Sequence, residues 1–490
     1  MAGATTRTVA VIGGGIAGLS AAWELSGTPD PGVEVIVFEE EDTFGGKLRT
    51  GSFGGRPVEL GPDAFVARRP EALALCGELG LSRELVAPGV RGASVWARGR
   101  LRPLPEGLAL GVPTRLGPLA RSGICSPAGL VAPALDLLAP LRRGSGPSRG
   151  PSSGPVVDRA VGEVVRRHLG AEVTNRLAAP LIGGIHAGSV ETMSAAAVFP
   201  ALLEADGRGG SLMRALGATL APGGGVGPLP GESAPVFLSV RGGFGRLVET
   251  LVGALRERKV DLRPATPVRS LCRVDDGDKQ RWRIGTDGAE VDVDGVVIAL
   301  PARPAGRLLR AHDASLADTL DSVRYSSVAI VTMGYDSGAI GHPLDGTGFL
   351  VSRSAGGRAD PLVTACTWLS SKWPELRRDG EVLLRASVGR DGDERCRSLA
   401  DDELVTRCVA ELGVMMGVRR PPHEALVSRW PEAFPQYDVG HLDRVHAMET
   451  AAGRLPSLAL AGAALHGVGI PACIGSGRRA ARAVVAAGAP

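Results

Sequence analysis

The first residues with a clear apolar pattern predict a strand, a glycine-rich turn and a helix. Residues 8–12 form a short β-branched run, and Ile16, Leu19 and Trp23 then recur at helical spacing beyond the glycines. A second apolar run at residues 33–39 predicts the next strand. This order predicts a β-α-β unit at the start of the chain.

The pattern is less regular between residues 91 and 232, where short apolar segments alternate with proline and glycine. Residues 142–155 read RRGSGPSRGPSSGP, a composition that cannot bury a face, so we expect a disordered loop there. Residues 126–141 are the most apolar stretch, although Asp136 and two prolines interrupt them. This stretch predicts a helix packed on a core, and a lipid-contacting surface is the alternative.

Regular patterning returns at residue 236. Residues 236–240 predict a strand, and residues 244–255 predict an amphipathic helix. Residues 290–300 alternate and then become continuously apolar, which is typical of one strand entering a buried sheet. Between residues 304 and 425 the pattern predicts several strands and one helix, around residues 403–415. Residues 458–487 predict a strand, a glycine-rich turn and a helix of small residues.

Composition narrows the function classes. The chain has 490 residues, enough for two or three domains, and its net charge of +3 gives no reason to expect a nucleic-acid partner. The seven cysteines are scattered without a CxxC pair, so we expect no disulfide, no metal site, a reducing cytoplasm and seven small buried side chains. No apolar run reaches about 18 residues, so the sequence predicts no transmembrane segment.

The glycines after the first strand form a GxGxxG turn at Gly13, Gly15 and Gly18. They permit the tight turn, the approach of a pyrophosphate and close packing of helix on strand, respectively. Glu39 ends the second strand, 21 residues after Gly18, where a carboxylate would bind an adenosine ribose. Together these features predict a dinucleotide site.

A second motif favours FAD over NAD. After Glu39 the chain continues to Gly45-Gly46-Lys47 and Thr50, and this segment resembles the extended signature of the FAD-dependent amine oxidase superfamily. Residues 59–65, ELGPDAF, resemble the stretch that passes the flavin ring in that superfamily. The C-terminal glycine-rich block resembles its flavin-side partner, in which a helix N-terminus stabilises reduced flavin.

We therefore expect non-covalent FAD. The expected contacts are Gly13, Gly14, Gly15, Ile16, Ala17, Gly18, Glu39, Glu40, Gly46, Lys47, Gly61, Pro62, Asp63, Ala64, Gly462, Val468, Gly469 and Ile470.

Further segments resemble the oxygen-dependent porphyrinogen oxidases of heme biosynthesis. They are PLIGGIHAG at residues 180–188, GGF at 242–244, ATPV at 265–268 and the RW-to-GH stretch at 429–441. The resemblance covers almost the whole chain. It implies that Val268 meets the adenine and that Trp430 lies near the flavin.

Within this family, TWxxxKWP at residues 367–374 and the Arg68-Arg69 pair resemble the bacterial group that oxidises coproporphyrinogen III. Basic residues at the entrance of the substrate site would suit the four propionates of coproporphyrinogen III. The resemblance implies three two-electron steps, each moving a hydride from the porphyrinogen carbon skeleton to flavin N5 with loss of a pyrrole N–H proton. Dioxygen then reoxidises the flavin and leaves hydrogen peroxide. No general base is assigned. Candidate substrate contacts are Arg69, Gly184, His186, Phe349, Leu350 and Lys372.

The expected architecture is α/β: a discontinuous Rossmann-like FAD-binding domain, an α+β substrate domain and a mainly helical insert. The FAD-binding domain would comprise residues 1–90, 233–303 and 426–490; the helical, substrate- or membrane-facing domain residues 91–232; and the α+β domain residues 304–425. We expect a cytoplasmic protein, with peripheral membrane association and handover to a downstream iron chelatase as further expectations.

Four alternatives stay open at this point. They are a protoporphyrinogen IX oxidase, an amine oxidase, a carotenoid-type desaturase and a flavin-bound protein without enzymatic activity. An amine oxidase commonly holds a lysine near flavin N5, but the comparable stretch at residues 325–331, YSSVAIV, contains none.

Overall fold

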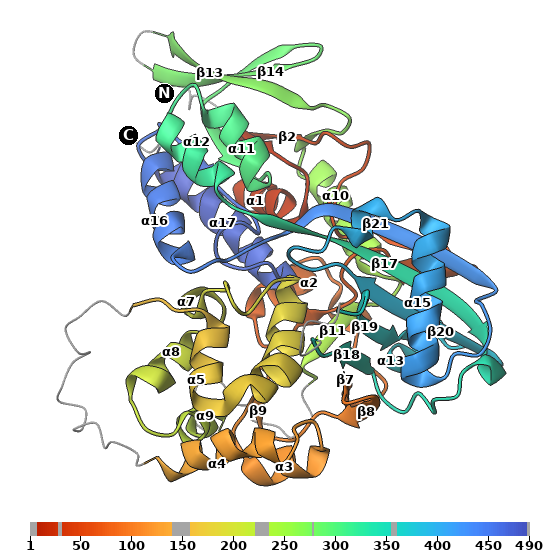
Figure 1. Ribbon diagram of the computed structural model, residues 1–490. Coiled ribbons are helices and arrows are strands. Elements are labelled where there is room, and N and C mark those ends of the chain that lie inside the picture. Colours follow the sequence, from red (N-terminus) through yellow and green to blue (C-terminus); the bar gives the residue numbers. More distant parts are fainter. Residues whose placement is uncertain are drawn as a thin grey trace. The chain divides into compact units, whose positions relative to one another are not determined.

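The computed structural model forms two compact units, each assembled from segments that are distant in the sequence (Figure 1). Unit 1 comprises residues 1–87, 235–324 and 442–490, and unit 2 comprises residues 88–234 and 325–441. The predicted division into three domains remains a prediction. The structure describes residues 7–27, 32–139, 157–220, 235–276, 279–353 and 360–487, and the predicted loop near 142–155 lies outside them.

Unit 1 is built on a parallel sheet with strand order β12-β2-β1-β16-β22. Val9 and Val11 of β1 face a core shared with helices α1, α10 and α17, while the alternate residues Ala10 and Ile12 are equally buried. Burial on both faces explains why these strands are almost continuously apolar. The bounds are β1 Arg7–Ile12, β2 Val33–Phe38, β12 Asp261–Arg263, β16 Gly295–Ile298, β22 Leu458–Leu460, α1 Ile16–Ser26, α10 Phe244–Glu257 and α17 Ile470–Ala487.

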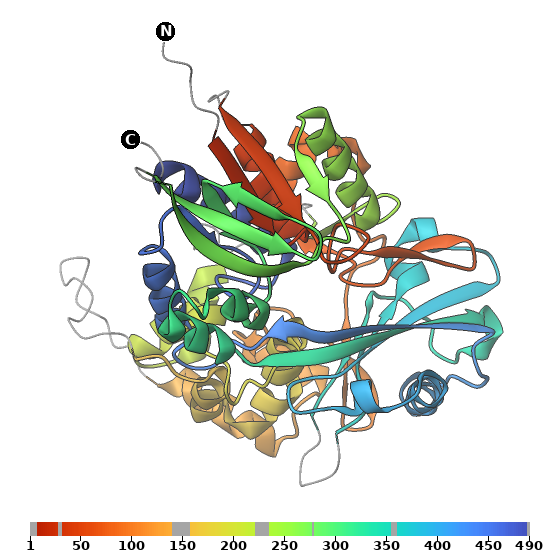
Figure 2. The same cartoon turned by 90° about the horizontal axis from the view of Figure 1, so that it is seen from above.

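A small antiparallel sheet covers part of this parallel sheet, with β14 contacting β16 and β15 contacting β1. Figure 2 shows the hairpin of β13 and β14 lying across the red strands β1 and β2. Residues 290–300 were expected to form one strand, and this expectation is wrong. They form β15 and β16 in two different sheets, separated at Asp294, whose carboxylate accepts a hydrogen bond from the Thr8 amide at 2.8 Å.

The remaining elements of unit 1 include the strands of this antiparallel sheet and of two other small sheets. They are β3 Thr50–Phe53, β4 Arg56–Glu59, β5 Phe65–Val66, α2 Pro70–Glu78, η1 Ser82–Glu84, β6 Leu85–Val86, β11 Phe237–Val240, β13 Val268–Asp276, β14 Lys279–Thr286, β15 Glu290–Val293, α11 Ala302–Leu309, α12 Ala314–Asp321 and α16 His441–Ala452.

Unit 2 contains a seven-stranded sheet with order β21-β17-β20-β19-β18-β7-β8. The predicted helix around residues 403–415 is confirmed as α15, which packs against one face through Leu404, Cys408 and Leu412. The bounds are β7 Ser94–Ala97, β8 Arg100–Pro103, β17 Tyr325–Asp336, η4 Ser337–Ala339, β18 Gly348–Val351, β19 Val363–Trp368, α13 Leu369–Lys372, η5 Pro374–Leu376, β20 Glu381–Val388, α14 Arg395–Ser398, α15 Asp401–Met416 and β21 Glu424–Pro435.

Helices make up most of the remainder of unit 2 and surround a second core (Figure 1). The bounds are β9 Leu108–Ala109, β10 Val112–Pro113, α3 Leu116–Ser122, η2 Ala128–Leu130, α4 Val131–Leu138, α5 Val161–Val173, η3 Thr174–Gly183, α6 Gly184–His186, α7 Ala195–Val198, α8 Pro200–Gly207 and α9 Leu212–Leu220. Here η3 is a π-helix.

The predicted helix within residues 126–141 is confirmed as α4, but it is only partly packed. Asp136 is buried, and its carboxylate accepts hydrogen bonds from the amides of Leu212 and Met213, both at 3.0 Å. It therefore stabilises the N-terminus of α9. The opposite side of α4 exposes Leu135 and Leu138, which are 60% and 78% accessible.

The expectation for the cysteines is wrong at one position. All seven cysteines are free thiols, but only six are buried, and Cys272 is exposed on β13. The expectation of seven buried cysteines is therefore wrong at this position, since Leu271 is the only buried residue among residues 268–274 of β13. Within the described ranges no helix is long and apolar enough to cross a membrane, and no cluster of side chains suits a metal ion.

A test of the fold follows from the contact between α1 and α17. A Cβ on Gly477 would lie 1.9 Å from the Ala17 carbonyl oxygen, so Gly477→Ala forces the two helices apart. We expect a loss of about 1–3 kcal/mol in the free energy of unfolding. Thermal or urea denaturation measures it.

Gly253→Ala is the matched control, because a Cβ there meets no atom within 4 Å. It should leave stability unchanged or raise it by up to about 1 kcal/mol, since alanine favours a helix. Equal effects of the two substitutions would contradict the packing argument.

Candidate active site

The GxGxxG turn joins β1 to α1 as the sequence predicts. Gly13 has a φ of +106°, and a Cβ on Gly18 would lie 1.8 Å from the Gly13 carbonyl oxygen. Both positions therefore require glycine. Gly15 precedes α1 without a side-chain cap, and a Cβ there would meet nothing within 4 Å. Open space in front of the first-turn amides is what an anionic group needs.

Glu39 lies over this turn from the end of β2. Its carboxylate accepts hydrogen bonds from the Gly14 amide at 2.5 Å and the Glu41 amide at 3.0 Å. The Thr266 amide donates to the Glu39 carbonyl at 2.7 Å, which brings the start of β13, with Val268, to the same edge. Glu40 is exposed beside it. The residues predicted to bind the adenosine are thus gathered together.

The second glycine pair packs directly on the first. The Gly45 amide donates to the Gly14 carbonyl at 2.9 Å, and a Cβ on Gly46 would lie 3.3 Å from the Gly15 Cα. Gly45 and Gly46 have φ values of +111° and +58°. The structure therefore brings two predicted phosphate-binding turns into contact, although they are 30 residues apart.

Lys47 follows these glycines. Its side chain is accessible to solvent, yet crowding by surrounding protein lowers the pKa of its ammonium group, and the Cys473 thiol partly offsets this effect. No carboxylate within the described ranges pairs with it. A cation that is partly desolvated and unpaired fits the diphosphate of FAD, so these residues suit the cofactor.

Thr50 and Glu59 have a structural part that the sequence did not indicate. The Thr50 hydroxyl accepts a hydrogen bond from the Gly245 amide at 2.9 Å, and the Glu59 carboxylate accepts one from the Phe244 amide. Both side chains therefore cap α10. The β3–β4 hairpin that carries them leads into Gly61, which is buried, and then into Pro62, Asp63 and Ala64, which are half-buried.

The C-terminal block completes the same edge of the parallel sheet. The Gly462 amide donates to the Ser476 hydroxyl at 3.0 Å, which folds the turn back onto α17. Val468 and Gly469 lead into α17, which begins at Ile470. Helices α1 and α17 therefore both begin beyond the carboxyl ends of parallel strands, where ligands bind in sheets of this kind.

The candidate substrate contacts are divided between the units. Arg69 is exposed before α2 in unit 1. In unit 2, Gly184 is exposed, and a Cβ on it would lie 3.7 Å from the Leu350 side chain. Phe349 is 3% exposed and packs against Trp368. Phe349 and Leu350 point to opposite faces of the sheet, because neighbouring residues of a strand alternate. Only Leu350 of this pair is thus near Gly184.

Two further candidate substrate contacts, Lys372 and His186, and the predicted flavin contact Trp430 also lie in unit 2. Lys372 places its ammonium nitrogen 5.0 Å from the centre of the Trp373 ring. Trp430 is half-buried on β21, opposite Val328 of β17, and its predicted flavin contact stays a prediction. His186 has a pKa lowered to about 4 by burial and, to a lesser extent, by His441, so it is neutral near pH 7.

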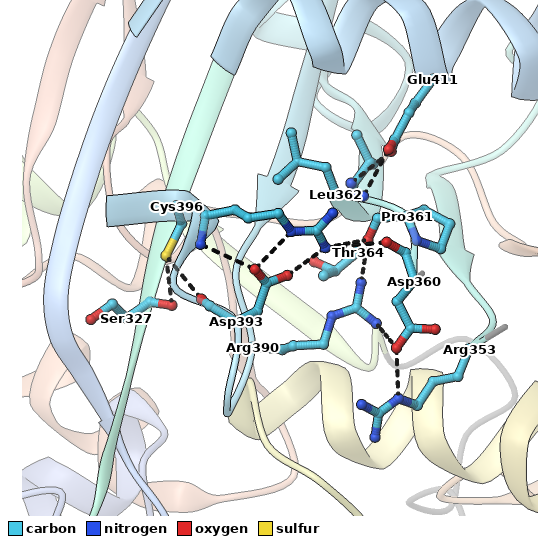
Figure 3. A network of polar contacts seen from close by, with 12 residues as sticks. Ser327, Arg353, Asp360, Pro361, Leu362, Thr364, Arg390, Asp393, Cys396 and Glu411 are labelled. Atoms are coloured by element: carbon cyan, nitrogen blue, oxygen red, sulfur yellow. Dashed lines mark hydrogen bonds and ion pairs between the residues drawn. The ribbon is translucent and has the colours of Figure 1, made fainter. Parts of the chain in front are cut away.

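The Gly184–His186 turn is also supported by residues that the sequence did not indicate. The Asp391 amide donates to the Ala187 carbonyl at 2.8 Å. The preceding Arg390 donates to the Pro361 carbonyl at 2.6 Å and contacts the Asp360 carboxylate at 3.4 Å, which also binds Arg353 (Figure 3). This network fixes the segment after β20 against the turn.

The lysine beside the glycine turns provides a test of the cofactor site. Lys47→Gln should weaken FAD binding roughly ten- to hundredfold, because a charge-assisted contact contributes about 1.5–3 kcal/mol. Titration of the apoprotein with FAD, followed by flavin fluorescence, measures this change. Lys259→Gln, at an exposed lysine after α10, is the control, and an equal loss there would refute the assignment.

Several full-length relatives are porphyrinogen oxidases. The chain is 32% identical to the coproporphyrinogen III oxidase of Bacillus subtilis, with 97% of each chain covered. It is 35% identical to the enzyme of the same name from Mycobacterium leprae, covering 98% of this chain and 99% of the relative. Protoporphyrinogen oxidase from Bos taurus is 31% identical, with 98% of each chain covered.

Solved structures share the fold over the same length. A crystal structure from Exiguobacterium sp. 255-15, provisionally described as a protoporphyrinogen oxidase, has a TM-score of 0.82 at 30% identity and covers 98% of this chain and 99% of its own. Putrescine oxidase with bound putrescine has a TM-score of 0.64 at 17% identity, covering 98% and 99%, which shows the fold alone.

A protein family described as flavin containing amine oxidoreductase matches residues 16–485. This match confirms the expected α/β flavoprotein fold and the FAD cofactor. The chain therefore belongs to the flavin containing amine oxidoreductase family, and it is an oxidoreductase.

Proposed function

We propose that this chain oxidises coproporphyrinogen III to coproporphyrin III, a six-electron reaction, with dioxygen as the acceptor and hydrogen peroxide as the by-product. The observation that carries the proposal is full-length similarity at 31–35% identity to bacterial proteins named coproporphyrinogen III oxidase. Oxidation of protoporphyrinogen IX is the second candidate, because relatives of that name match over the same length.

Unit 1 would hold the cofactor. Bound FAD accepts two electrons from each oxidised position of the substrate and passes them to dioxygen. The first-turn amides of α1 and the Lys47 ammonium would bind the diphosphate, and Glu39 the adenosine ribose. For the last role Glu39 would exchange its present bond to the Gly14 amide for ribose hydroxyls. The start of α17 would face the pyrimidine edge of the flavin ring.

Unit 2 would supply an apolar surface for the macrocycle. Gly184 lacks a side chain, is exposed and lies beside Leu350, so a flat ring could approach the backbone closely at this place. His186 is neutral near pH 7, so it would not repel or bind propionates through charge. No residue is assigned as a general base.

The four propionates of the substrate require cations. Arg69 is exposed and carries a permanent charge, which suits bidentate binding of a carboxylate. The Lys372 ammonium, held over Trp373, is the second candidate. Each would distinguish the four-propionate substrate from the two-propionate one by an added charge-assisted contact.

The poor solubility of the product leads to a further proposal about its transfer. Coproporphyrin III is a flat, poorly soluble ring that a downstream iron chelatase would consume, and direct handover would limit its release into water. The exposed apolar side of α4, formed by Val131, Leu135 and Leu138, supports peripheral association of a cytoplasmic enzyme with a membrane.

An amine oxidase is the nearest rival activity within the family. The strand comparable to its lysine-bearing segment is β17, whose residues 325–331 contain no lysine. The absence of a lysine from residues 325–331 favours a porphyrinogen over an amine as the substrate.

The substrate is tested by anaerobic stopped-flow reduction of the bound flavin. Coproporphyrinogen III should reduce it at least about tenfold faster than protoporphyrinogen IX at equal subsaturating concentration, because additional charge-assisted contacts contribute about 1.5–3 kcal/mol each. Faster reduction by protoporphyrinogen IX would favour the second candidate. Reduction by putrescine alone would refute both, and persistence of reduced flavin in air would exclude an oxidase.

Membrane association is tested by cosedimentation with vesicles of phosphatidylglycerol and phosphatidylcholine. Leu135→Glu should lower the bound fraction at least about fivefold, because one buried leucine contributes about 1.5–3 kcal/mol. Val414→Glu is the matched control, since Val414 is 75% exposed on α15. Equal binding by both variants and the unchanged protein would contradict the proposal.

A further inference from the structure

The turn at residues 183–188 depends on hydrogen bonds to three of its carbonyl groups. The Gly183 carbonyl accepts from the Gly188 amide at 2.9 Å, and the Ala187 carbonyl accepts from the Asp391 amide at 2.8 Å. Ala187 has a φ of +46°, a left-handed conformation that L residues seldom adopt. External support is therefore needed to keep this backbone in place.

Gln436 supplies the third of these bonds. It is 4% exposed, directly after β21, and its Nε2 donates to the His186 carbonyl at 3.2 Å. The same nitrogen lies 2.9 Å from the Ser326 hydroxyl and 3.0 Å from the Phe434 carbonyl. The latter two partners hold the amide to the sheet, and only the His186 bond reaches the turn.

Gly188 shows how closely the turn approaches this amide. A Cβ on Gly188 would lie 2.6 Å from the Gln436 Oε1 and 2.7 Å from the Met193 Cε. The turn backbone therefore rests directly on the carboxamide. A change at Gln436 has to be transmitted to the turn, because no gap separates them.

The outer side of the same turn is accessible to a ligand. Gly184 and Ile185 are exposed, and Gly184 is next to Leu350. We propose that Gln436 is a positioning residue: by holding the His186 carbonyl it sets the location of the Gly184–Ile185 surface on which the porphyrinogen ring lies. This inference rests on the proposed function, and it assigns Gln436 no contact with the substrate.

The Asp391 bond comes from the main chain, so side-chain substitution does not remove it. The Gln436 bond is removed by Gln436→Met, which keeps the length and approximate volume of the side chain. We expect the KM for coproporphyrinogen III to rise about five- to tenfold, as for loss of one hydrogen bond, with kcat changed less than about twofold. The dissociation constant of coproporphyrin III, measured by quenching of its fluorescence, should rise in parallel.

Ser326→Ala is the matched control. It removes another partner of the same buried amide, on the sheet side, and leaves the His186 bond intact. It should lower the melting temperature as Gln436→Met does, but leave KM and product binding within about twofold of the unchanged protein. Similar rises in KM for both variants, or for neither, would overturn the positioning role.

Gly188→Ala provides a second route if Gln436→Met fails to fold. The added methyl group pushes the turn away from the amide and should also raise KM with little change in kcat. An unchanged KM here would overturn the inference.

The unchanged holoenzyme separates the two proposals. If it is not reduced by either porphyrinogen, the proposed function fails and the positioning role fails with it. If it is reduced and the variants match it, only the positioning role fails.

Discussion

The close approach of backbone to backbone at glycine is the constraint on which the structure of unit 1 depends. Helix α1 touches β1 at Gly18 and α17 at Gly477, and a single methyl group at these places would lie only 1.8 Å and 1.9 Å, respectively, from a carbonyl oxygen. This spacing holds the N-termini of α1 and α17 at one edge of the sheet. The second glycine pair, at Gly45 and Gly46, then closes on the first. The positions of the two helix N-termini and of Lys47 thus follow from the packing of the protein itself.

Local elements of this unit could be predicted because their signals are local. Residues 8–12 and 33–39 gave two strands within one residue of β1 and β2, and the glycine spacing located the turn. Residues 290–300 show the limit of such reasoning. The change from alternating to continuous apolar residues was visible, but it marked a passage from one sheet to another. A pattern along one segment does not specify which strands it pairs with.

Unit 2 was less predictable because its contacts join distant segments. Strands β7 and β8 complete a sheet whose other strands follow more than 220 residues later, and Asp136 caps a helix 76 residues away. Thr50 and Gln436 belonged to recognised motifs, yet their side chains serve helix α10 and the Gly184–His186 turn. A sequence motif identifies candidate functional residues, whereas the hydrogen-bond partners of their side chains can be identified only in the folded chain.

The order of the segments in unit 1 also bears on biosynthesis. Strand β22 and helix α17 lie far along the sequence from β16 and α1, yet they flank these two elements. A nascent polypeptide therefore lacks one strand of the parallel sheet and the helix that covers α1 until residues 458–487 have been synthesised. Deletion of residues 458–487 would therefore uncover both the edge of β16 and the apolar side of α1.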